Sequence, residues 1–129
     1  MESLKIRTGA INLEILGDDG VSRGIFTFNP DDIESAKQVF AIQQEYEVKQ
    51  KEFEERAKAC ETPEDKINLM SEIVDYMESS IDRCFGNGSS EILFGKAKTL
   101  SMFEDFFKGI IPYYQNAKKA RISKYTQNK

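Results

Sequence analysis

Alternating apolar and polar side chains near the N-terminus predict a β-hairpin. Residues Ile11–Leu16 read Ile-Asn-Leu-Glu-Ile-Leu, which is the period of a strand with one buried face. The sequence Gly-Asp-Asp-Gly at residues 17–20 predicts a turn, and a second strand is expected over Val21–Phe28. The apolar phase slips by one residue at Gly24, which indicates a β-bulge.

The first ten residues leave the number of strands open. Leu4 and Ile6 also alternate with polar side chains, so the sheet has either two strands or three, with this segment as the edge. A sheet of two strands is only marginally stable alone, and residues 1–28 therefore need helices to pack against.

Two long helices with a short connection are predicted next. Asn29 is the expected cap and Pro30 the first helical position of a helix over residues 30–60. Thr62-Pro63 repeats this signal for a helix over residues 63–85, and so short a connection predicts a long antiparallel helical hairpin with a coiled-coil-like seam. The expected inward positions are Val39, Ile42, Tyr46, Phe53, Ala57 and Cys60, then Ile67, Met70, Val74, Met77, Ile81 and Cys84.

A third helix is predicted over residues 100–123, after a Gly-Asn-Gly loop at 86–88 and a short apolar turn at 92–95. Pro112 removes one backbone hydrogen bond from this helix and predicts a kink after Gly109. Residues 125–129 are expected to fray. The expected inward face is Phe103, Phe107, Ile110, Tyr114 and Ala117, widened by Phe106 and Ile111. The chain is thus predicted to be one α+β domain over residues 1–129, mostly α.

Composition excludes several classes of function. The chain has 129 residues, no His and two Cys, which excludes a disulfide framework and any catalytic or metal site that depends on His. No segment approaches the roughly 20 apolar residues of a membrane span, and the N-terminus lacks the apolar segment of a signal peptide. We therefore expect a cytoplasmic protein that does not contact a membrane.

The charge is unevenly distributed along the chain. The net charge is −4, which argues against nucleic acid as a partner. Residues 31–65 carry eleven acidic and five basic side chains, whereas residues 116–129 carry five basic and no acidic ones. The basic end either complements the negative end of a helix dipole or binds an acidic partner.

Motifs for covalent chemistry are not recognisable. Six residues separate Gly88 from Gly95 and Ala97 follows the lysine, so the segment does not fit a phosphate-binding loop. Cys60 and Cys84 are predicted to lie roughly 30 Å apart and to stay reduced. The carboxylate pairs Glu72 and Asp75, or Glu104 and Asp105, are interpreted as solvated helix faces. The sequence predicts no enzyme, no cofactor and no metal.

Aromatic side chains in the third helix exceed what one buried stripe requires. Either the helix is covered on two sides, or part of it is exposed to a partner. We hypothesise that this helix, with the seam of the first, contacts a client protein or a second copy of the chain. The candidate partner-binding residues are Phe103, Phe106, Phe107, Ile110, Ile111, Tyr113, Tyr114, Lys118, Lys119 and Arg121.

Two segments resemble a known family. Phe26-Thr27-Phe28-Asn29-Pro30-Asp31-Asp32 follows a hairpin and precedes a long charged helix, and Phe94-Gly95, Leu100, Phe103, Asp105-Phe106-Phe107, Ile110 and Pro112-Tyr113 come later. This arrangement is similar to that of the small tail assembly chaperones of long-tailed bacteriophages and of prophages in Gram-positive bacteria.

The resemblance implies a non-enzymatic protein of the host cytoplasm that is absent from the finished virion. Its implied partners are the tape-measure protein and the tail-tube subunits. A frameshift near the end of the reading frame often extends such proteins, and the neighbourhood of Lys118 and Lys119 is compatible with one. The alternative hypothesis is a small phage regulator or nucleic-acid-binding protein that uses the basic C-terminal segment. Association of copies through the helices is left open.

Overall fold

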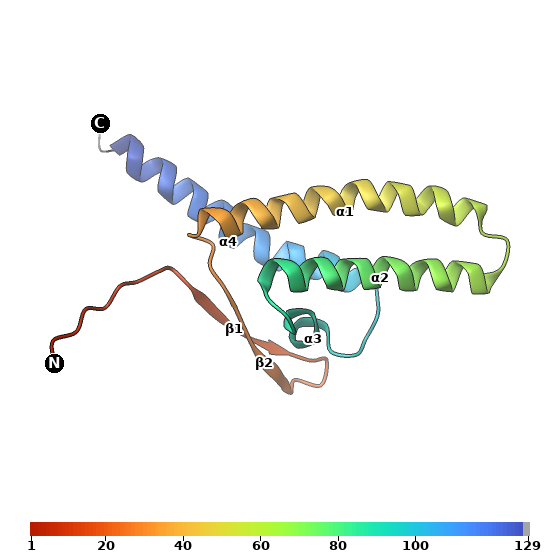
Figure 1. Cartoon of the computed structure of the whole chain (residues 1–129), viewed down its shortest axis with the longest axis horizontal. Coiled ribbons are helices and arrows are strands. Elements are labelled where there is room, and N and C mark those ends of the chain that lie inside the picture. Colours follow the sequence, from red (N-terminus) through yellow and green to blue (C-terminus); the bar gives the residue numbers. More distant parts are fainter. Residues whose placement is uncertain (128–129) are drawn as a thin grey trace.

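A computed structural model describes the backbone of residues 1–127 and the side chains of residues 1–123. A two-stranded sheet comes first and helices follow, which confirms the mostly α fold with an N-terminal β-hairpin (Figure 1). In chain order, the elements are β1 (Ile11–Leu16), β2 (Ser22–Phe28), α1 (Ile33–Ala59), α2 (Pro63–Phe85), α3 (Ser89–Phe94) and α4 (Ser101–Gln127).

The β-hairpin has the predicted turn and bulge. Ile15 pairs with Gly24 but Leu16 pairs with Ser22, so one residue of β2 is left over next to Gly24. The φ of Gly24 is +135°, a value that favours glycine at this bulge. Phe26 and Phe28 share the inner face of the sheet and are buried, as their spacing predicts.

The third strand that Leu4 and Ile6 suggested does not form. Residues 1–10 have no regular structure, and Leu4 is 85% exposed. The reason lies where this arm joins the body. The Asn29 side chain donates a hydrogen bond of 2.8 Å to the carbonyl oxygen of Thr8, and Gly9, with a φ of +90°, lies close to the side chain of Asp31. These contacts hold the chain toward the start of α1 instead of along the sheet.

The first helix begins later than predicted. Asp32 is its cap, and one carboxylate oxygen accepts hydrogen bonds from the backbone N–H groups of Glu34 and Ser35 at 2.9 and 3.3 Å. Asn29 instead closes a turn by accepting from the N–H of Asp31, so Pro30 precedes the helix. The start of α2 is as predicted, with Thr62 as the cap and Pro63 in the first turn.

The segment between α2 and α4 contains a short helix that the sequence did not predict. Residues 89–94 form α3 in place of an apolar turn, because Asp82 accepts a hydrogen bond of 2.8 Å from the N–H of Ser90 and fixes its first turn. The last helix, α4, is continuous through Pro112 to Gln127, past the predicted end at 123. Of the segment expected to fray, residues 128–129 lie outside the described part. The kink after Gly109 stays a prediction.

The core lies where α4 is sandwiched between the β-hairpin and the helical hairpin. Tyr114 and Phe103 of α4 are fully buried, and the hydroxyl groups of Tyr114 and Ser35 share a hydrogen bond of 2.7 Å. Phe26 of β2 packs its ring edge-on against Phe85 and Phe106, with ring centres 5.1 and 5.9 Å apart. Aromatic rings from three layers therefore join the sheet, α2 and α4.

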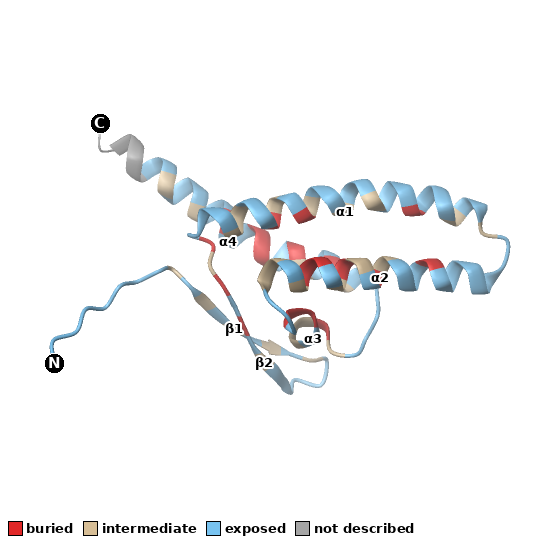
Figure 2. Ribbon diagram, in the orientation of Figure 1, coloured by how far each residue is buried: buried red, intermediate tan, exposed pale blue. Residues whose placement is uncertain are grey.

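The helical hairpin is covered along only part of its length. We call residues 33–46 and 74–85 its proximal half, and residues 47–59 and 63–73 its distal half. In Figure 1, α4 begins behind the middle of α2 and runs away from the α1–α2 turn, so neither α4 nor the sheet reaches the distal half. Buried positions gather in the proximal half and become sparse toward that turn (Figure 2).

Candidate functional site

The structure places most of the predicted partner-binding residues of α4 inside the chain's own core. Their proposed exposure to a partner is corrected, because the sheet covers one side of α4 and the helical hairpin covers another. Phe106 is partly buried, and its ring meets those of Phe26, Phe85 and Phe94. The fully or nearly buried members are Phe103, Phe107, Ile110, Ile111 and Tyr114.

The remaining predicted residues of α4 lie at the surface or beside α1. Tyr113 is 38% exposed, and Lys118 and Lys119 are exposed. Arg121 is partly buried and donates hydrogen bonds of 3.2 and 3.3 Å to the carbonyl oxygens of Pro30 and Asp31. This contact fastens α4 to the start of α1. For Tyr113, Lys118 and Lys119, a role in partner binding stays a prediction.

The apolar stripe of α2 is longer than the core that covers it. Val74, Met77 and Ile81 are at most 2% exposed. The same stripe continues toward the start of α2 at Met70 and Ile67, which are 49% and 64% exposed. We call Ile67 and Met70 the stripe end. The prediction that they point inward is therefore wrong.

Helix geometry shows which face the stripe end occupies. At about 100° per residue, Met70 lies in the same direction around the helix axis as Met77 and Ile81, which α4 and the sheet cover in the proximal half. Leu69 lies about 100° away from Met70 and is buried, although it is not part of the main core. The stripe end is thus a direct continuation of the covered core face.

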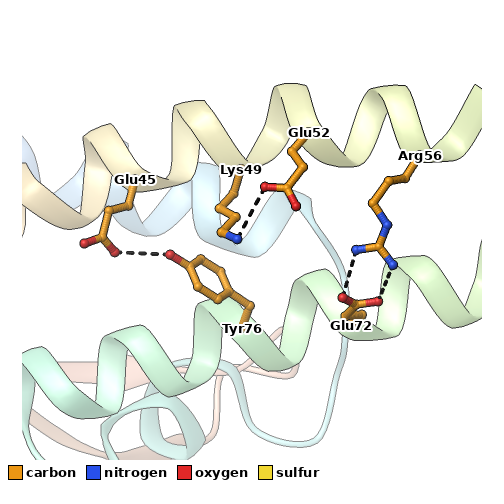
Figure 3. Close-up of polar contacts among 6 residues, drawn as sticks. All are labelled: Glu45, Lys49, Glu52, Arg56, Glu72 and Tyr76. Carbon is orange, nitrogen blue, oxygen red and sulfur yellow. Dashed lines mark hydrogen bonds and ion pairs between the residues drawn. The ribbon is translucent and has the colours of Figure 1, made fainter.

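Polar contacts link α1 to α2 on both sides of the boundary between the proximal and distal halves (Figure 3). Arg56 of α1 donates two hydrogen bonds, of 2.9 and 2.8 Å, to the two carboxylate oxygens of Glu72 on α2. These bonds lower the pKa of Glu72 and raise that of Arg56, because they favour both charged forms. The Tyr76 hydroxyl donates to Glu45 at 3.1 Å, and the Lys49 ammonium lies 5.4 Å from the Tyr76 ring centre.

An open groove of about 790 Å³ runs between α1 and α2 on this polar side. Its charged side chains are already paired, since Glu45 lies 3.7 Å from Arg83 and Lys49 lies 3.4 Å from Glu52. Burial and the bond to Glu45 raise the pKa of Tyr76, so its hydroxyl stays protonated at neutral pH. The charged side chains of this groove are therefore paired with one another, while Ala41, Ile42 and Val48 add apolar surface to its lining.

A second open groove, of about 660 Å³, separates β1 from α4. We call it the β1–α4 groove. Leu13 and Ile15 line it from the sheet and Met102 lines it from α4, together with Phe106 and Tyr113 from the predicted set. Its charged lining residues include Asp18 and Asp105, and Arg23, which donates a hydrogen bond of 2.8 Å to the carbonyl oxygen of Leu93.

Two of the carboxylates considered for chemistry, Glu72 and Asp75, have structural partners. Glu72 pairs with Arg56, and Asp75 lies 3.1 Å from the Lys98 ammonium. Both cysteines are free, and burial raises the pKa of the Cys84 thiol to about 11, so it stays protonated at neutral pH. Within residues 1–123, no group of three or more His, Cys, Asp or Glu side chains could hold a metal ion.

No helix in the described part of the chain is both long enough and apolar enough to cross a membrane.

The exposure of Ile67 and Met70 was not predicted from the sequence. The relative lengths of the helices and strands do indicate it. The 27 residues of α1 span about 40 Å, whereas the seven residues of β2 span about 23 Å. So short a sheet cannot cover the whole helical hairpin. Apolar stripes that continue to the far turn must then be exposed or covered by another polypeptide.

Comparison with known families gives one match. The sequence model of a family of unknown function, DUF6673, matches residues 23–129. No curated protein and no solved structure matches the chain.

Proposed function

This chain belongs to the DUF6673 family of unknown function, and we propose that it is a non-enzymatic tail assembly chaperone. Its client is the tape-measure protein, the tail-tube subunits, or both, as the resemblance of its two segments to such chaperones implies. It acts in the host cytoplasm by holding a helical segment of the client against the distal half of the helical hairpin.

The stripe end is the observation that carries this proposal. Ile67 and Met70 continue a face that elsewhere packs against α4, so a helix is the kind of element that this face accommodates. Complete burial of a fully exposed Ile or Met side chain contributes about 1.5–3 kcal/mol, and covering the exposed parts of Ile67 and Met70 together provides about as much as one such side chain. The contact between Arg56 and Glu72 keeps the two helices in place before the client arrives.

The basic end of α4 supports the alternative, a nucleic-acid-binding regulator, less well. Arg121 is engaged by backbone carbonyl groups of the chain itself, which leaves Lys118 and Lys119 as the free cations among the described side chains of that segment. Binding to nucleic acid through Lys118 and Lys119 alone would be weak and would fall with salt.

Co-expression with a phage tape-measure protein or a tail-tube protein tests the proposal. The double variant Ile67→Glu with Met70→Glu should lose at least tenfold in client affinity while its circular dichroism spectrum and Tm stay unchanged. The matched control is Ile33→Glu, at a residue that is 58% exposed in the first turn of α1, where an acidic side chain is favourable.

Equal client binding by the double variant and the control would contradict the proposal. Salt-dependent binding to DNA or RNA, lost in a Lys118→Glu and Lys119→Glu variant, would instead favour the alternative.

A further inference from the structure

The N-terminal arm, residues 1–10, exposes apolar side chains on a segment that is separate from the sheet. Leu4 and Ile6 are 85% and 75% exposed, and the arm leads away from the rest of the molecule (Figure 1). Its residues 3–8 read Ser-Leu-Lys-Ile-Arg-Thr, which in an extended conformation places Leu4 and Ile6 on one side and Lys5 and Arg7 on the other. Such a segment is suited to join a sheet.

The outer edge of β1 is available for another strand. The sheet has the order β1–β2, and among residues 1–127 no backbone hydrogen bond joins β1 to any segment other than β2. The β1–α4 groove lies beneath this edge, where Leu13 and Ile15 are only partly buried. An added strand would therefore gain backbone hydrogen bonds and also cover apolar side chains.

We propose that the arm of one copy pairs with β1 of a second copy, and that the exchange is reciprocal, giving a dimer. Antiparallel pairing of residues 3–8 with Ile11–Leu16 matches six residues with six. Leu4 and Ile6 then lie beside Ile15 and Leu13 and enter the β1–α4 groove.

Charge complementarity supports this register. With Leu4 opposite Ile15 and Ile6 opposite Leu13, Lys5 lies directly opposite Glu14, which is the charged residue of β1 and is exposed on the outer face of the sheet. Oppositely charged side chains in this position stabilise strand pairing.

The anchoring of the arm favours a second copy over the chain's own sheet. The hydrogen bond from Asn29 to Thr8 and the close approach of Gly9 to Asp31 hold the base of the arm beside the segment that precedes α1, and the rest of the arm leads away (Figure 1). Folding back onto its own β1 would require both contacts to break. Ten extended residues span about 33 Å, which is enough to reach a neighbouring molecule. The arm and β1 also precede residues 23–129, so this pairing is separate from the family match and from the client site.

Analytical ultracentrifugation of the full chain tests the dimer. The wild type should dimerise, and Leu4→Asp with Ile6→Asp should be monomeric with the circular dichroism spectrum of the wild type, because both side chains are exposed within one copy. Lys5→Glu alone should weaken the dimer roughly tenfold, since two like-charge pairs replace two opposite-charge pairs. Adding Glu14→Lys to Lys5→Glu should restore the dimer affinity of the wild type.

Three results would overturn the proposal: a wild-type monomer at 100 µM total concentration, dimerisation that the arm variant leaves intact, or no rescue by the double charge reversal. A dimer broken by Ile67→Glu with Met70→Glu but not by the arm variant would show association through the helices instead. None of these measurements involves the client, so the outcome is independent of the proposed function.

Discussion

The proximal and distal halves of the helical hairpin are built from the same two helices but differ in what surrounds them. In the proximal half, Val39 and Ile81 are at most 1% exposed beneath α4 and the sheet. In the distal half, Phe53 and Leu69 are buried between polar surroundings, while Met70 and Ile67 remain exposed. An apolar stripe on a helix therefore indicates which face can be buried. The length of the neighbouring elements decides how much of that face is buried.

The two halves also differ in how they are held together. The proximal half depends on aromatic packing across three layers, with Phe106 in contact with rings from the sheet, from α2 and from the segment before α4. The distal half depends on contacts between α1 and α2 themselves, of which the pair of Arg56 and Glu72 is the shortest ion pair. A surface held by its own polar contacts can lose or gain a partner without unfolding.

The largest expected difference between the halves is in the response to truncation. Met77→Ala removes a fully buried side chain from the proximal part of the α2 stripe and should lower the free energy of unfolding by about 2–5 kcal/mol. Met70→Ala removes a side chain of the same α2 stripe that is 49% exposed. It should change the free energy of unfolding by no more than about 0.5 kcal/mol. Urea unfolding followed by circular dichroism measures both. Similar losses for the two variants would mean that the distal stripe is covered within one chain.

A smaller effect on stability is expected from the ion pair between Arg56 and Glu72 in the distal half. The pKa of Glu72 is lowered from its ordinary value of 4.5 in the folded state by the hydrogen bonds from Arg56. Its contribution to stability is therefore full above pH 4.5 and is lost as the pH falls through the lowered folded pKa.

Thermal unfolding of the wild type and Glu72→Gln between pH 7 and pH 3 checks this sign. The wild type should have the slightly higher Tm at pH 7, and the difference should vanish at the acidic end. The effect is small because the two side chains are 47% and 54% exposed. A difference that is equal at both ends of the range would show that Glu72 is not stabilised by its charge.

Local signals explain why most elements were predictable. The alternation in β1, the phase slip at Gly24 and the Thr62-Pro63 start of α2 each act within a few residues, and each has the predicted outcome. The inward face of α4 was also recognisable from its spacing. The choice between two neighbouring residues that could each cap α1 was harder to predict. Asp32 is the cap in place of Asn29, because the Asn29 side chain closes the preceding turn.

Non-local geometry accounts for what the sequence left undetermined. The arm fails to add a strand because Thr8 and Gly9 are held by residues about twenty positions later. Most of the excess aromatic residues of α4 are buried, because the helix is covered on two sides. The stripe end is exposed because α4 starts beside the middle of α2, and nothing in the local pattern of Ile67 and Met70 reports that placement.

Amide hydrogen exchange of the chain, alone and in complex with the proposed tape-measure or tail-tube client, tests most directly whether the distal half is the docking surface. We predict that the client slows exchange in residues 63–73 and leaves the already protected proximal half of α2 unchanged. Protection that appears only in α4, with residues 63–73 exchanging as fast as in the free chain, would contradict the proposal that the distal half binds the client.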